Sequence, residues 1–109
     1  MTVRELKESL SLTEIAMPCP DREVVGAYVG DLLSWVMGRA RENSAWITIM
    51  SNVNVVAVAS LVDVSLVILA EGVRLDEKTE QLANEKGVNV LSSTMSSFEI
   101  SGKLSSLKI

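Results

Sequence analysis

The segment GAYVGDLLSWVM, residues 26–37, carries two glycines and an aspartate where a predicted strand gives way to a predicted helix. Loops of this kind often bind phosphate, because backbone N–H groups and the helix dipole face the ligand. The dinucleotide fingerprint G-x-G-x-x-G is absent, since Gly26 and Gly30 are four residues apart and no third glycine follows in register. The negative charge of Asp31 also opposes an anionic ligand. Two interpretations remain: Gly30 makes a turn and Asp31 caps the helix, or both belong to a binding site.

Other recognised catalytic and metal-binding patterns are also missing. The chain has no histidine and a single cysteine, Cys19, which excludes Ser-His-Asp and Cys-His catalysis, histidine-ligated metals and an internal disulfide. The one Gly-Lys pair, Gly102-Lys103, has serine at position 97 and leucine at 104, so it is not a Walker A loop. We therefore expect no catalytic residue, no metal and no resident cofactor. Cys19 is interpreted as structural, with a reactive thiol as the alternative.

Polar residues recur after each predicted strand of the central region. Because the carboxyl ends of parallel strands meet at one edge of a sheet, these residues are expected to share a rim, where open α/β sheets bind ligands. Polar turns also occur in any α/β domain, so a plain structural role is the alternative. The predicted ligand-binding set is Gly30, Asp31, Ser34, Thr48, Asn52, Asn54, Glu71 and Gly72.

Hydrophobic periodicity and capping signals predict the elements that position this rim. Thr2 with Glu5, and Ser96 with Glu99, form capping boxes that open a first and a last helix. Asp76 opens and Gly87 closes a charged helix between them. The expected helices cover residues 3–10, 32–40, 53–62, 77–86 and 97–107, and the expected strands cover 12–17, 23–29, 45–50, 65–70 and 88–91.

The valine-rich segment 53–62 fits a strand by composition and a helix by its apolar spacing. We predict a helix, because a strand would run into strand 65–70 without a turn residue between them. Strands that alternate with helices imply βαβ units. The predicted fold class is α/β, a mainly parallel sheet with helices on both faces, in a single small domain covering residues 1–109.

Charge and hydropathy limit the partners. A net charge of −4 and a pI near 4.8 disfavour nucleic acid and anionic membranes, which need clustered Lys and Arg. The apolar run 55–70 contains Asp63 and is shorter than the roughly 20 residues of a membrane span. With an N-terminus that lacks a signal-peptide pattern, this predicts a cytoplasmic protein. The 48 % hydrophobic content suggests strands buried on both faces, an apolar surface covered by a second subunit, or both. Because the valine-rich segment 53–62 is more apolar than one face of a small sheet needs, we expect a homodimer.

Three segments, GAYVGDLLSWVMGRA, AWITIMSNVNVVAVASLVDVSLVILAEG and DEKTEQLANEKGVNVLSS, together resemble the DRTGG domain family over about residues 12–107. That family is similar to the N-terminal domain of HPr kinase/phosphorylase and occurs as an insert in phosphotransacetylases and CBS-domain pyrophosphatases. The string D-R-T-G-G itself is absent. The resemblance implies a regulatory module that dimerises and binds an adenine nucleotide, another small ligand or a partner protein.

Two classes of function follow. The first is a non-catalytic regulatory or ligand-binding module acting as a homodimer. The second is a small enzyme with a carboxylate and hydroxyl site and no histidine. We favour the first, because general acid-base catalysis needs a tuned proton carrier and no pair of residues stands out for that role.

Overall fold

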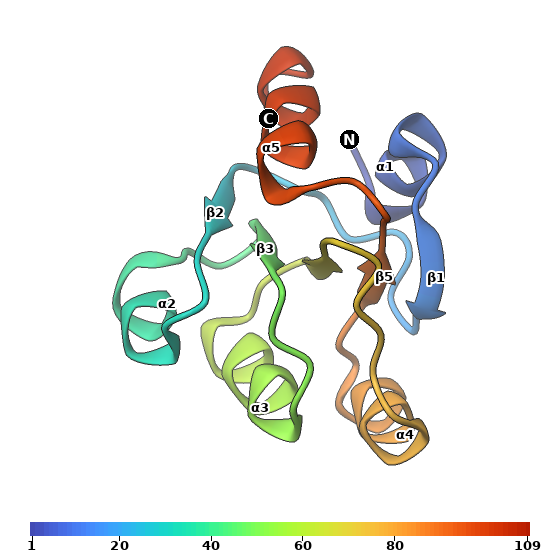
Figure 1. Ribbon diagram of the computed structural model, residues 1–109, viewed down its shortest axis with the longest axis vertical. Helices are drawn as coiled ribbons and strands as arrows, with labels where there is room; N and C mark the ends of the chain where they lie inside the picture. Colours follow the sequence, from blue (N-terminus) through green and yellow to red (C-terminus); the bar gives the residue numbers. More distant parts are fainter.

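The computed structural model describes all 109 residues as one five-stranded sheet with helices on both faces (Figure 1). The strands lie in the order β1-β5-β4-β3-β2. Strands β2 to β5 are mutually parallel, and β1 pairs antiparallel with β5. The elements are α1 (Val3–Leu10), β1 (Thr13–Ala16), β2 (Ala27–Val29), α2 (Leu33–Arg39), β3 (Ala45–Thr48), α3 (Val53–Val62), β4 (Leu66–Leu69), α4 (Glu77–Lys86), β5 (Val90–Ser92) and α5 (Ser97–Ser106).

The helices divide into two layers. Helices α2, α3 and α4 lie on one face of the sheet, and α1 and α5 lie on the other (Figure 1). The three βαβ units follow one another along the sheet without a reversal of strand order, so right-handed crossovers send α2, α3 and α4 to the same face. The predicted α/β class, with a mainly parallel sheet covered on both faces, is confirmed.

The sheet separates two hydrophobic cores, one on each face, and successive residues of the central strands belong to them alternately. In β3, Trp46 belongs to the core under α2, α3 and α4, and Ile47 belongs to the core under α1 and α5. The same alternation holds in β4 for Val67 and Ile68. Both faces of these strands are buried, which explains why their sequences are continuously apolar.

The predicted helix starts are confirmed where a capping box is present. Thr2 and Glu5 cap α1 reciprocally, and Ser96 and Glu99 do the same for α5. Asp76 caps α4, which ends at Gly87 with a φ of 72°. The valine-rich segment is helix α3, as predicted from the missing turn. No helix in the structure combines the length and apolarity that a bilayer crossing needs.

Two predictions between residues 23 and 40 are wrong in part. The predicted strand 23–29 is shortened to Ala27–Val29, because Val24 and Val25 donate to Met1 and Asn43 and the chain then bends at Gly26, where φ is 98°. Helix α2 buries only Val36 fully. The predicted helix 32–40 is thus shortened to Leu33–Arg39, and the apolar Leu32 and Met37 are exposed because α2 covers the edge of the sheet rather than its centre.

The loop before β2 is tied to the far end of α3 by Arg22. Its guanidinium donates to the Asp63 carboxylate at 2.8 Å and carbonyl at 3.0 Å, and to the Asn43 side-chain oxygen at 2.7 Å. Asn43 and Asp63 both have a φ near 60°, which few side chains adopt. Arg22 therefore holds two strained turns and the C-terminal end of α3 together.

Candidate functional site

The carboxyl ends of β2 to β5 meet at one edge of the sheet, as the parallel pairing requires, and helices α2 to α5 begin there. The structure distributes the predicted ligand-binding residues over this rim in three groups. One group joins the turn after β2 to the end of β3, a second joins the turns after β4 and β5, and a third lies at the start of α3.

The first group is organised by Asp31. One carboxylate oxygen, Oδ1, accepts a hydrogen bond from Thr48 Oγ1 at 2.7 Å and another from the Ile49 N–H at 3.0 Å. Thr48 Oγ1 in turn accepts from the Met50 N–H at 3.2 Å. The prediction that Asp31 caps the following helix is therefore wrong. The N-cap of α2 is Leu32, whose hydrocarbon side chain makes no cap bond. The Asp31 carboxylate is bound to Thr48 and Ile49 instead.

A hydroxyl that donates to a carboxylate has the geometry of an activated nucleophile. Thr48, however, is only 1 % exposed, so a substrate atom has no access to its Oγ1. The second carboxylate oxygen of Asp31 makes no hydrogen bond within the protein, and the residue is exposed. The pair is thus a structural bridge with one free acceptor that faces solvent.

Gly30 belongs to the same group through its backbone. Its N–H donates to the Ile47 carbonyl at 3.1 Å, and its carbonyl accepts from Trp46 Nε1 at 2.9 Å. A Cβ at this position would lie 2.9 Å from Tyr28 Cε2, so a larger residue requires the ring to move. Both polar backbone groups of Gly30 are already used by β3, and neither is free for a phosphate.

The second group contains Glu71 and Gly72, which turn the chain after β4 with φ values of 59° and 74°. Their N–H groups donate to the carbonyls of Met95 at 2.9 Å and Ser93 at 2.8 Å, in the turn after β5. The Ala70 N–H donates to the Thr48 carbonyl at 3.0 Å. The first two groups are therefore neighbours, and the exposed carboxylate of Glu71 is on the same rim as Asp31.

The remaining predicted residues do not join this cluster. Asn52 caps α3 by accepting from the Asn54 N–H at 2.9 Å. Asn54 lines a groove between α3 and α4 rather than the rim around Asp31. Ser34 is exposed on α2. The predicted residues share one edge of the sheet, but within the set only Asp31 and Thr48 are joined by a hydrogen bond between side chains. Gly30, Glu71 and Gly72 lie beside this pair and are bound through their backbone to other residues.

The rim has no hollow of its own. None of the five hollows in the structure is lined by Gly30, Asp31, Thr48, Glu71 or Gly72. Every buried polar side-chain atom has a hydrogen-bond partner, and no three acidic or cysteine side chains gather as a metal site would need. A topological switch point is also absent, because the parallel strands follow in sequence order. The rim therefore offers acceptors on an open surface.

The largest apolar hollow lies elsewhere and was not predicted. It is a groove of about 380 Å³ between α3 and α4, lined by Val53, Asn54, Val56, Ala57, Ser60, Leu61, Leu82 and Lys86. A sequence signal for this groove is present in α3, because residues 53–62 include no charged residue.

Two carboxyl groups have perturbed pKa values, and both are helix caps. The Thr79 N–H, hydrogen-bonded at 2.7 Å, lowers the pKa of Asp76 below its usual 3.8. Hydrogen bonds from Thr2 lower the pKa of Glu5 below its usual 4.5. Cys19 is half-buried: its N–H donates to the Asn89 side-chain oxygen at 2.9 Å, and its thiol donates to the Gly87 carbonyl at 3.6 Å.

Comparison with known proteins gives a likeness of fold. Neither the protein-family models nor the curated proteins contain a match to the chain. Among solved structures, it is similar to the CBS and DRTGG domains of the regulatory region of Clostridium perfringens pyrophosphatase, complexed with the activator diadenosine tetraphosphate. The TM-score is 0.74 at 16 % identity, covering 94 % of this chain and 45 % of that one.

The chain therefore shares its α/β fold with a part of that solved structure. The chain spans less than half the length of this neighbour. The resemblance to the DRTGG domain predicted from the sequence is confirmed as a relationship of fold.

Proposed function

We propose that this protein is a non-catalytic regulatory module that binds a small ligand and acts as a homodimer in the cytoplasm. The observation that carries the proposal is the fold, which the chain shares over 94 % of its length with the regulatory region of a pyrophosphatase. That neighbour is complexed with an adenine dinucleotide activator, so adenine nucleotides are the first ligand class to test.

The ligand-binding surface in this proposal is the rim at the carboxyl ends of the strands. Asp31 and Glu71 present free carboxylate oxygens there, which accept hydrogen bonds from hydroxyl or amino groups such as those of a ribose or a base. The N-termini of α2 to α5 point toward the same edge and favour a phosphate close by. The rim thus suits a ligand with hydroxyl groups and a phosphate better than a bare anion, which the two carboxylates would repel.

A thermal-shift titration with ATP, ADP, AMP and diadenosine tetraphosphate tests ligand binding, with inorganic phosphate as the comparison. A ligand at 100 times its Kd stabilises the native state by about 2.7 kcal/mol, which raises the Tm by several degrees in a domain of this size. No shift with any nucleotide would contradict the assignment of this ligand class.

Two alanine variants locate the site. Glu71→Ala removes the exposed carboxylate of a rim residue, and we expect it to weaken the bound nucleotide by about tenfold, the loss of one good polar contact. Glu42→Ala, in the exposed turn before β3 at the opposite edge of the sheet, is the matched control and should leave binding unchanged. Equal binding by both variants and the wild type would place the ligand away from the rim.

A further inference from the structure

Helix α3 has an unusual composition for its position. It is the middle helix of the layer formed by α2, α3 and α4 (Figure 1), yet its ten residues include no charged side chain. Its outer surface carries Val53, which is 50 % exposed, Ala57, and Leu61, which is 73 % exposed, with the uncharged Asn54 and Ser60 beside them. Surface helices normally place charged residues on the outer side, and a helix that is apolar all round is normally covered. The outer side of α3 therefore has the composition of an interface.

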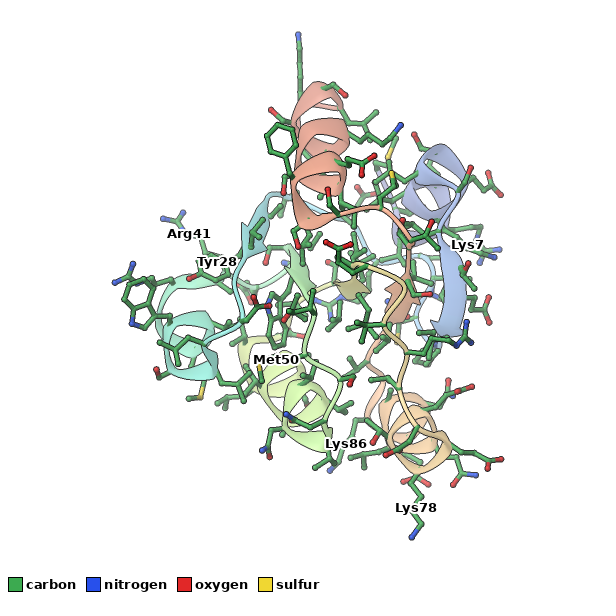
Figure 2. The ribbon with its side chains drawn as sticks, viewed as in Figure 1. Lys7, Tyr28, Arg41, Met50, Lys78 and Lys86 are labelled. Atoms are coloured by element: carbon green, nitrogen blue, oxygen red, sulfur yellow. The ribbon has the colours of Figure 1, made fainter.

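The groove beside α3 extends this apolar surface. Leu82 and Lys86 of α4 form the wall of the groove that faces Val56, Ala57 and Leu61 of α3. Figure 2 shows Lys86 on the side of α4 that faces α3, and Lys78 extending away from the sheet. The surface thus consists of the apolar stripe Val53, Ala57 and Leu61, the groove, and a charged border on α4.

We propose that a second copy of this chain covers this surface, with α3 packed antiparallel against α3 of the other copy around a two-fold axis at Ala57. This inference rests on the homodimer of the proposed function and assigns its interface. The stripe is self-complementary, since Val53 and Leu61 stand four residues on either side of Ala57. An antiparallel pair sets each Leu61 against Val53 of the other copy, and the small Ala57 lets the two helices approach at the axis.

The charges on α4 favour the same arrangement. Lys78 lies four residues before Leu82, and Glu85 lies three residues after it, both exposed and both beside the groove. Antiparallel packing brings the start of one α4 opposite the end of the other, where Glu85 and Lys86 stand, so each Lys78 comes within reach of Glu85 of the second copy while Lys86 faces its own α3. A stable interface needs about 800 Å² from each partner, roughly one seventh of the 5716 Å² surface of the chain, which the outer faces of three helices can supply.

Light scattering and sedimentation of two variants at exposed sites test whether the dimer forms through the outer surface of α3. Ala57→Glu brings two carboxylates together at the axis in the apolar centre of the interface, and we expect it to weaken the dimer by roughly 100-fold or more. Glutamate is a good helix former at an exposed site, so the monomer should keep its helical circular dichroism and its cooperative melting. Phe98→Glu on α5, where Phe98 is 86 % exposed on the opposite face of the sheet, is the control and should remain a dimer.

Two further experiments test the orientation. Lys78→Glu should weaken the dimer, and Lys78→Glu combined with Glu85→Lys should restore it, although both changes suit the dipole of an isolated α4. In a Cys19→Ser background, Ala57→Cys should form an intermolecular disulfide under a mild oxidant that takes up the two electrons and two protons. Leu61→Cys should not, because its two copies stand about 12 Å apart along antiparallel helices at 1.5 Å per residue.

The outcomes separate this inference from the proposed function. A wild-type chain that stays at the 11.8 kDa monomer mass at high micromolar concentration would overturn the homodimer and this interface together. A dimer that survives Ala57→Glu, or that dissociates in Phe98→Glu, would overturn the α3 interface and leave the homodimer intact. Crosslinking through Leu61→Cys instead of Ala57→Cys would overturn the antiparallel orientation.

Discussion

Replacing Asp31 tests whether the aspartate of the GDLLS segment bridges two strands or caps a helix. In Asp31→Ala the buried hydroxyl of Thr48 loses its acceptor, and the exposed Ile49 N–H exchanges a carboxylate for water. The first loss dominates, because an unsatisfied buried polar group costs about 1–3 kcal/mol. We expect the variant to lose about 2 kcal/mol of unfolding free energy.

Two other substitutions distinguish the roles. Asp31→Asn keeps an oxygen at the Oδ1 position and should lose only about 0.5–1 kcal/mol, since the acceptor is retained without its charge. Asp31→Ser should be as unstable as Asp31→Ala, because the shorter side chain does not reach Thr48. For a helix cap the order would be different, because serine caps about as well as aspartate.

Urea denaturation at neutral pH, with a double-mutant cycle between Asp31→Ala and Thr48→Val, gives the coupling directly. We expect a coupling energy of about 1 kcal/mol for this hydrogen bond. The m-values should not change, so that shifts in the midpoint report stability. Additive effects in the cycle, or an Asp31→Ser variant as stable as the wild type, would refute the bridge.

Two more predictions concern other anchoring contacts. Hydrogen bonds from Thr79 lower the pKa of Asp76 in the folded state below its ordinary value of 3.8. The ionised Asp76 carboxylate therefore stabilises the folded state above pH 3.8, and this stabilisation is lost as the pH falls through the lowered pKa. Asp76→Asn caps without titrating, so in urea melts its stability deficit relative to the wild type should narrow between pH 5 and pH 2; a constant deficit would reject the linkage. Arg22→Ala should lose about 1–2 kcal/mol, because it frees both Asn43 and Asp63, and Arg22→Lys should recover little, because an ammonium cannot reproduce the forked contact. Chemical denaturation checks this, and full recovery by lysine would show that charge alone matters.

The sequence predicted those parts of the fold that depend on short-range signals. The boxes at Thr2 and Ser96 are closed by residues three positions away, so the local pattern was sufficient. Helix α3 was identified because strand β4 follows it without room for a turn. These signals agree with the tertiary structure, and the α/β class followed from their alternation.

The candidate site could be predicted only as a rim. The predicted parallel topology placed Asp31, Thr48 and Glu71 at the same edge of the sheet. The pattern D-L-L-S, however, resembles a helix start and does not indicate that the Asp31 carboxylate accepts a hydrogen bond from Thr48 in the next strand. Likewise, Val24 and Val25 have the composition of a strand, yet their N–H groups are bound to Met1 and Asn43, far away in the sequence. Competition from such distant partners is not encoded in a local window.

The pairing of β1 with β5 has a consequence for how the chain folds. Strand β1 has no neighbour in the sheet other than β5. It can therefore pair only after β5 has formed, when Thr13 lies opposite Ser92 and Ala16 opposite Val90. Strands β2 to β5 can assemble progressively from adjacent βαβ units, whereas β1 closes the longest loop and bears the largest entropic cost. We therefore expect β1 to dock after the rate-limiting step, so that destabilising changes in it accelerate unfolding and leave the folding rate almost unchanged. During synthesis, β1 would thus emerge before the other four strands of this sheet and be among the last of them to pair.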